Sequence, residues 1–371
     1  VGGVGTGLYF ANQNTSGKTI SEKTSQKLDY INKLIDAKFL NKVNESDLED
    51  GIYKGLLEGL NDPYSVYYTA EEYRKMMEQT SGTYSGIGAL VSQNAETGII
   101  TVVKAFADAP AAKAGVKNGD IIYKVKGKEV TGVDINNVVT EMKGEKGTTV
   151  DITVYRESEK KYIDFTITRD QVNEPTVEYK MLDKKKKIGY IQISQFEEVT
   201  YDQFTKALDD LKKQGMKAVI FDVRSNPGGL YETVCKMLDE ILPEGNLVST
   251  KDKYGNEEKQ TSDSKCLDMP MVVLQNKDSA SASEIFAGAI QDFNAGKIVG
   301  TQSFGKGIVQ TILPLSDGSA VKLTVQDYYT PSGKNIHGKG ITPDVEVELE
   351  ENATSDTQLE KAKETIMELM K

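Results

Sequence analysis

The stretch MVVLQNKDSASASE, residues 271–284, joins an apolar run to a segment rich in serine and alanine. The apolar run over 271–275 is typical of a strand buried in a sheet, and the spacing over 283–293 predicts a helix. Ser281 therefore lies where a buried strand passes into a helix, whose first amides have no partner within the helix. A serine placed there can attack a carbonyl while those amides face the carbonyl oxygen.

Strand and helix patterns alternate around this stretch. Apolar, β-branched runs at 188–193 and 218–223 predict strands, and helical spacing at 201–214 and 229–242 predicts helices after them. Such repeated β–α units predict a mostly parallel sheet covered by helices. Further strands are predicted at 309–314, 320–328 and 345–349, and the polar residues 244–268 predict a hairpin or flap.

At 371 residues the chain is too long for one compact core. We expect an α/β multidomain protein with helical terminal segments, divided as follows: a stub or linker at 1–24, a helical region at 25–80, a module of short strands with two helices at 81–168, a core at 169–350, and a closing helix at 351–371. Capping boxes are predicted at Ser46 with Glu49 and at Thr69 with Glu72. Residues 1–11 are apolar and glycine-rich, and are interpreted as the remnant of a signal or membrane anchor, or else as a flexible terminus.

Composition excludes several classes of function. The net charge of −11 argues against a nucleic-acid partner, because phosphate binding needs a concentrated basic surface. The two cysteines form no CxxC pair, so no zinc site is predicted, and Cys235 falls in an apolar helical pattern typical of a buried thiol. No stretch is long and apolar enough to span a bilayer.

A nucleophilic serine needs a base, and two candidates are present. The chain has one histidine, His337, in a glycine-rich loop. The other candidate is Lys306 in FGKGIVQ, residues 304–310, because a lysine that burial keeps neutral can accept the serine proton. Gln310 is predicted one helical turn beyond the lysine, where its amide can orient the amine without adding charge. We favour Lys306, and His337 remains the alternative.

The oxyanion of the reaction requires backbone donors. The Ala282 N–H is the first candidate, since it opens the helix after Ser281. The second comes from NPGG, residues 226–229, which follows the predicted strand at 218–223. Glycines allow the backbone to approach a substrate closely, so Gly229 is favoured, with Gly228 next. The alternative is that these residues form only a turn.

Taken in order, these segments resemble the carboxyl-terminal processing proteases, also called tail-specific proteases. The resemblance covers the chain from about residue 28 and rests on six markers in the family's order: LNDPYS at 60–65, YSGIG at 84–88, FDVRSNPGG at 221–229, SASASE at 279–284, FGKGIVQ at 304–310, and TPSG at 330–333 through ITPD at 341–344.

The resemblance implies a crotonase/Clp-like protease core with an inserted PDZ domain. In that domain Gly86, Ile87, Gly88 and Ala89 form the loop that binds a peptide carboxylate, with the peptide added as a strand. By the same resemblance Ser281 is the nucleophile, Lys306 the base and Gln310 its positioner, while Gly229 (or Gly228) and Ala282 supply the oxyanion donors. No metal or cofactor is implied.

The expected function is a serine endopeptidase that cleaves proteins near their C-termini, with the PDZ domain binding the substrate tail and regulating access. The resemblance also implies an extracytoplasmic location, in the cell envelope or secreted, with a possible membrane tether. It implies a homodimer through the terminal helices, which suits the apolar stripes at 28–60 and 358–370. Two alternatives stay open: an inactive PDZ adaptor on a protease scaffold, and a crotonase-like acyl-CoA enzyme.

Overall fold

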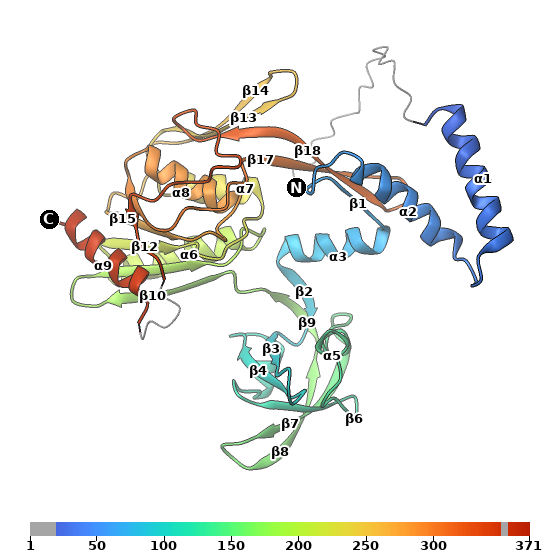
Figure 1. The fold of residues 1–371 in the computed structure, drawn as a ribbon. Coiled ribbons are helices and arrows are strands. Elements are labelled where there is room, and N and C mark those ends of the chain that lie inside the picture. The colour runs from blue at the N-terminus through green and yellow to red at the C-terminus, as the bar shows by residue number, and fades with distance from the viewer. Residues whose placement is uncertain (1–19, 350–354) are drawn as a thin grey trace. The chain divides into compact units, whose positions relative to one another are not determined.

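A computed structural model describes residues 20–349 and 355–371 (Figure 1). Residues 1–19 of the predicted stub at 1–24, and part of the link to the last helix, lie outside the described residues. The chain divides into two compact units, Val1–Gly55 and Leu56–Lys371, each of which is described by itself. None of the described helices combines the length and the apolar character needed to cross a bilayer.

The first unit contains helix α1, Glu22–Lys38, and most of α2, Glu45–Glu58. Ser21 caps α1 by accepting the N–H of Thr24, so this helix begins earlier than its apolar stripe. The predicted cap of α2 at Ser46 is wrong. Asn44 accepts the Ser46 N–H with its side chain and starts the helix two residues sooner, since asparagine caps as well as serine does.

The prediction that residues 25–80 are helical throughout is wrong. A short strand, β1 (Val66–Tyr68), separates α2 from α3 (Ala70–Ser81). It pairs antiparallel with β18 (Ala320–Tyr329), opposing Val66 to Lys322. This pairing crosses most of the chain, so local patterns gave no sign of it. The capping box of α3 is confirmed, with Thr69 accepting the Glu72 N–H and Glu72 accepting the Thr69 N–H.

The strand-rich module follows α3. Its sheet has the order β3-β4-β5-β7-β8, so β3 is an edge strand, with β6 beside β5 and a separate β2–β9 pair. Strands β7 and β8 pair antiparallel as a hairpin. The strands are β2 (Thr83–Gly86), β3 (Ala89–Gln93), β4 (Ile100–Ala105), β5 (Ile121–Val125), β6 (Lys128–Glu129), β7 (Thr149–Arg156), β8 (Lys161–Thr168) and β9 (Asp170–Asn173), and the helices are α4 (Pro110–Ala114) and α5 (Ile135–Met142).

The core contains the predicted, mostly parallel sheet, in the order β10-β11-β12-β15-β16-β19. Only the β10–β11 pair is antiparallel. The strands are β10 (Val177–Asp183), β11 (Ile188–Ile193), β12 (Ala218–Asp222), β15 (Met271–Gln275), β16 (Gly296–Gly300) and β19 (Val345–Glu346). Every residue of β12 and β15 is buried, as expected for strands covered on both faces.

Helices cover both faces of this sheet (Figure 1). Helices α6 (Thr200–Lys213), α7 (Tyr231–Asp239) and α8 (Ala282–Asp292) pack on the face that carries Val219 and Phe221. Helix α9 (Thr357–Leu369) packs on the other face, against Ala218 and Ile220. Ile366 of α9 is fully buried there, so the expectation that the apolar stripe at 358–370 is free for a partner is wrong.

A second, antiparallel sheet joins distant parts of the chain. Its order is β1-β18-β13-β14, with β17 also paired to β18. The predicted hairpin within 244–268 is confirmed as β13 (Gly245–Asp252) and β14 (Glu257–Ser262). Strand β17 (Ile308–Pro314) begins just after Lys306 and pairs with β18 (Ala320–Tyr329). Strand β18 in turn pairs with the short strand β1.

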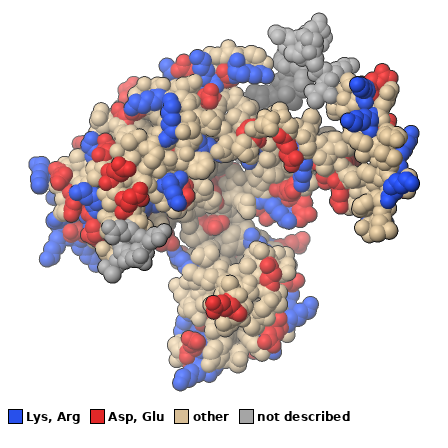
Figure 2. All heavy atoms as spheres, in the orientation of Figure 1, with Lys and Arg blue, Asp and Glu red and all other residues tan. Residues whose placement is uncertain are grey.

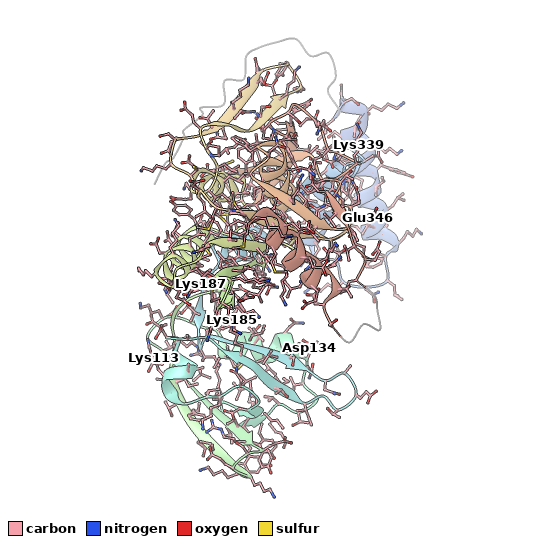
Figure 3. The ribbon with its side chains drawn as sticks, turned by 90° about the vertical axis from the view of Figure 1, so that its left-hand side faces the viewer. Lys113, Asp134, Lys185, Lys187, Lys339 and Glu346 are labelled. Atoms are coloured by element: carbon pink, nitrogen blue, oxygen red, sulfur yellow. The ribbon has the colours of Figure 1, made fainter. Side chains whose placement is uncertain are left out.

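Charged side chains are dispersed over the face shown in Figure 2, where Lys and Arg alternate with Asp and Glu. Figure 3 places the two labelled lysines of the dense basic run, Lys185 and Lys187, at one end of the core strands. The run of four lysines at 184–187 forms the turn between β10 and β11; Lys185 is exposed, whereas Lys187 is half-buried. This run therefore forms a turn that mostly faces solvent.

Candidate active site

Ser281 occupies a sharp turn between strand β15 and helix α8. Its backbone has φ 55° and ψ −112°, a conformation that residues other than glycine rarely adopt. A turn of this kind between a strand and a helix exposes a nucleophile above the sheet. Gly228 makes room for it, because a Cβ on Gly228 would lie 2.8 Å from the Cβ of Ser281.

Glu284 organises the backbone around Ser281. This carboxylate is fully buried and accepts four hydrogen bonds. Its Oε2 accepts the N–H groups of Ser281 and Lys306, each at 2.8 Å. Its Oε1 accepts the Ser303 hydroxyl at 2.5 Å and the Gly305 N–H at 2.7 Å. Four donors satisfy the carboxylate, which fixes the loop that carries Lys306 beside the turn that carries Ser281.

Lys306 lies in the loop before β17 and is half-buried. Burial, and next the charge of Lys322, hold the pKa of its amine below the usual 10.5, while Asp62 and Glu284 oppose this shift. Its Nζ lies 4.7 Å from the centre of the Tyr64 ring. Among the described residues, no hydrogen bond joins this amine to the Ser281 hydroxyl.

Gln310 does not lie one helical turn beyond Lys306, as predicted. It is on strand β17, where it is paired with Thr324 of β18, and its Nε2 lies 3.4 Å from the Thr324 hydroxyl. The segment after Lys306 extends because it enters a long antiparallel ladder with β18, which overrides any local helical tendency.

The glycine turn after β12 lies directly against Ser281. The buried Asn226 holds this turn, since its side chain accepts the Gly228 N–H at 2.9 Å and donates to the Ile193 carbonyl. The N–H of Gly228 is therefore occupied. The N–H groups of Gly229 and Ala282 have no hydrogen-bond acceptor within the described parts of the chain, and the Ala282 nitrogen lies 3.1 Å from where a Cβ of Gly228 would be.

His337 is exposed, and its backbone packs against Gly307. Its N–H donates to the side chain of Asn335. No ring hydrogen bond to Ser281 is present in the described structure. Through Glu284, the backbone of Ser281 is linked to that of Lys306 and not to that of His337 in the described structure.

The predicted carboxylate loop connects β2 to β3. Gly86 ends β2, Ile87 is buried in the module's core, and Ala89 begins the edge strand β3. Gly88 has φ 76°, and a Cβ there would lie 2.3 Å from that of Ala109, so only glycine fits. The loop thus lies at the start of an edge strand. Within the described sheet no other strand pairs with the outer edge of β3, so a peptide could pair there.

Sequence analysis gave no role to three residues near Ser281 and Lys306. Glu284, Tyr64 and Thr324 contact the proposed catalytic groups or their loops. A signal existed for Glu284, since it follows Ser281 by three positions, the spacing of a capping box. Tyr64 and Thr324 reach the site only through the β1–β18 pairing.

Comparison with known proteins agrees with this arrangement. Residues 187–347 match Peptidase family S41, residues 85–167 match the PDZ domain, and residues 8–72 match the Activating protease CtpB N-terminal domain. The chain is 38% identical over 326 residues to a probable CtpA-like serine protease of Staphylococcus epidermidis, covering 87% of this chain and 65% of that protein. It is 37% identical over 344 residues to the Staphylococcus aureus protein of that name, covering 91% and 68%. The chain thus spans about two thirds of the length of these curated relatives.

Solved structures agree. The photosystem II D1 C-terminal processing protease is similar with a TM-score of 0.51 and 28% identity, over 93% of this chain and 91% of that one. A putative S41 protease from Bacteroides fragilis shares the fold, with a TM-score of 0.56 and 16% identity over 86% and 90%. The predicted α/β fold, a protease core with an inserted PDZ domain, is confirmed. The chain belongs to the S41 family of serine peptidases, among the CtpA-like proteases.

Proposed function

We propose that the protein is a serine endopeptidase in which Ser281 attacks the peptide carbonyl and Lys306 accepts its proton. The observation that carries this proposal is the shared carboxylate oxygen of Glu284, which ties the backbones of both residues together. Burial favours the neutral amine that a general base requires. Lys306 then returns the proton to the leaving amine, and water activated by Lys306 hydrolyses the acyl-enzyme.

The negative charge of the tetrahedral intermediate falls between two free donors. The N–H groups of Gly229 and Ala282 suit this role because neither is engaged elsewhere in the described structure, whereas the Gly228 N–H is held by Asn226. Removing one such donor typically costs about 2.7–4 kcal/mol of transition-state stabilisation. Preorganised backbone dipoles therefore supply much of the expected rate.

Catalysis requires a rearrangement of two side chains. The amine of Lys306 rests on Tyr64, and Gln310 faces Thr324. We expect substrate binding to bring the amine to the Ser281 hydroxyl and Gln310 to the amine, which its carbonyl oxygen can orient. Catalytic hydrogen bonds often form only in the substrate complex, so the resting geometry is compatible with this role.

Turnover of a denatured model protein tests the assignment. We expect cleavage by the wild-type protein and its loss in Ser281→Ala and in Lys306→Ala, with folding checked by circular dichroism. The exposed residue Lys339 provides a matched control, since Lys339→Ala removes a lysine that faces solvent. Equal cleavage by the wild type and Ser281→Ala, or no cleavage by either, would contradict the proposal, and the second result would favour an inactive PDZ adaptor.

The PDZ domain is proposed to bind the C-terminal tail of a protein substrate at residues 86–89 and to regulate access to Ser281. The edge position of β3 supports this, because a peptide can add there as a strand while the loop N–H groups donate hydrogen bonds to its carboxylate. Calorimetry with a peptide that has a free C-terminus and with its amidated form tests the proposal. Equal affinity for the two forms would contradict carboxylate recognition.

A homodimer and a location outside the cytoplasm, with a membrane tether, complete the proposal. The exposed apolar side chains of α1 and α2, including Leu34 and Ile52, support a second copy as the partner. We expect the double variant Leu34→Asp/Ile52→Asp to lower the mass measured by light scattering to that of a monomer. Cell fractionation tests the location, and recovery of the protein in the cytoplasmic fraction would contradict it.

A further inference from the structure

Residues 62–65, here called the 62–65 turn, belong to the LNDPYS motif, to which the proposed mechanism assigns no role. Asp62 forms this turn by accepting the Ser65 hydroxyl at 2.6 Å and the Tyr64 N–H at 3.1 Å. Ser65 is buried and in turn accepts the Thr324 N–H at 3.0 Å. Strand β1 follows at once and pairs with β18. The turn is thereby fixed to the strand that runs beside the proposed catalytic residues.

The 62–65 turn contacts the surroundings of both Lys306 and Gln310. The Tyr64 ring presents its face to the Lys306 Nζ at 4.7 Å, a distance typical of a cation–π interaction. Thr324, whose N–H the turn holds through Ser65, is also the residue that contacts Gln310. The 62–65 turn therefore fixes the residues that contact the proposed base and its proposed positioner.

We propose that Tyr64 is a positioning residue for the general base, and that its ring face holds the protonated Lys306 amine in a resting position between catalytic events. This inference rests on the proposed function of Lys306. An aromatic face attracts an ammonium but has little attraction for a neutral amine. Loss of the proton therefore weakens this contact and frees the amine to approach Ser281.

The charged groups around the amine form two opposing sets. Asp62 in the turn and Glu284 on α8 favour the protonated form, and Tyr64 acts in the same direction. Lys322 on β18 and burial favour the neutral form. The resting position is thus stabilised by the 62–65 turn, while the environment of the loop keeps the proton easy to lose.

The pH dependence of lysine acetylation tests this inference without requiring turnover. In a Ser281→Ala background, trace acetic anhydride reacts only with the neutral form of Lys306, and mass spectrometry of its peptide across pH gives a labelling midpoint. We expect Tyr64→Leu to lower this midpoint by about half a pH unit or more, because the ring no longer stabilises the ammonium. Tyr64→Phe keeps the ring and should leave the midpoint unchanged.

A matched control is available on the β13–β14 hairpin. Tyr254 is 77% exposed and lies under the amine of Lys253, 5.0 Å from its ring centre, far along the chain from the site. We expect Tyr254→Leu to leave the Lys306 midpoint at its wild-type value. If Tyr64→Leu does not fold, Tyr64→Met, whose flexible side chain adapts to irregular space without an aromatic face, replaces it in the comparison.

An unchanged Lys306 midpoint in Tyr64→Leu would overturn the proposal, as would an equal shift in Tyr64→Phe, which would assign the effect to the hydroxyl. The catalytic assignment fails separately. Full activity of Lys306→Ala would contradict the role of Lys306 as base, whereas the labelling midpoint measures only the contact between its amine and Tyr64.

Discussion

The N–H groups of Ser281 and Lys306 donate to the same oxygen atom, Oε2 of Glu284, at 2.8 Å each. The proposed nucleophile and the proposed base are separate in sequence, and this one acceptor fixes the distance between their backbones. The other oxygen of the carboxylate holds Ser303 and Gly305 of the Lys306 loop. The relative position of the proposed nucleophile and base therefore depends on one buried glutamate side chain.

Replacing this carboxylate tests its importance. In Glu284→Gln one of the two acceptor oxygens becomes an NH₂ group. This group is itself a donor, so it cannot accept the hydrogen bonds that the oxygen accepted. Since hydrogen bonds to charged groups contribute about 1.5–3 kcal/mol each, we expect the free energy of unfolding to fall by roughly 3 kcal/mol. We also expect kcat to fall at least tenfold, with a smaller change in KM. Unchanged kcat in a folded variant would show that the shared oxygen does not align the site, and Glu360→Gln, on the exposed surface of α9, is the control.

The pH dependence of the rate follows from the state of Lys306. Its pKa lies below 10.5, and only the neutral amine accepts the serine proton. We expect kcat/KM to rise with pH through this pKa, and His337→Ala to leave the midpoint unchanged. Steady-state kinetics across pH checks this. A midpoint that disappears in His337→Ala, with the fold intact, would instead identify the histidine as the base.

The contact between Gly228 and the nucleophile gives a sharper test. Gly228 has φ 106°, and a Cβ there would lie 2.8 Å from both Ser281 Cβ and the Ala280 carbonyl oxygen. We expect Gly228→Ala to displace the serine and to lower kcat more than tenfold. Gly119→Ala is the matched control, since Gly119 has φ 86° with open space around its Cβ position, which isolates backbone strain of about 1–2 kcal/mol. Equal kcat in the two variants would contradict the steric argument.

Local sequence patterns were sufficient to predict the central sheet and the turn at Ser281. The buried run at 271–275 and the helix after it are contiguous, so apolar period and helix spacing identify both. The same holds for Thr69 with Glu72, which form their capping box within one turn of the chain. Where the signal and the structure lie within a few residues of each other, sequence analysis was accurate.

Features that depend on distant pairing were not predictable in this way. The strand predicted at 309–314 is confirmed as β17, so placing Gln310 one helical turn beyond Lys306 was wrong, and the contact of Gln310 with Thr324 depends on the pairing of β17 with β18. The three residues of β1 are too few to show a period, and their partner, β18, lies more than 250 residues further along. The stripe of α9 is the same whether it meets its own sheet or a second copy, so burial of Ile366 emerged only from the tertiary structure.

Glu197 is a second buried acid, beside the glycine turn, but unlike Glu284 it is poorly satisfied. It is 6% exposed, and among the described side chains its Oε2 is buried without a hydrogen-bond partner. This oxygen lies 2.3 Å from where a Cβ of Gly82 would be. The preceding residue, Phe196, donates to the Gly228 carbonyl. A carboxylate without a partner in such a place is costly to ionise.

The stability of the protein should therefore depend on the protonation of Glu197. Burial, and next the charge of Glu174, raise its pKa from 4.5 to about 7. Between these values the folded state binds a proton that the unfolded state has lost, so this group's contribution to stability is full below pH 4.5 and is lost as pH rises to about 7. Glu197→Gln removes the titration, and we expect it to be more stable than the wild type by up to about 3 kcal/mol at pH 8, and by little at pH 5. Denaturant unfolding at both pH values measures this, with Glu198→Gln, at an exposed neighbour, as the control. The prediction is contradicted if the two proteins differ in free energy of unfolding by the same amount at pH 5 and pH 8. That result would mean that Glu197 stays ionised in the folded protein at both pH values.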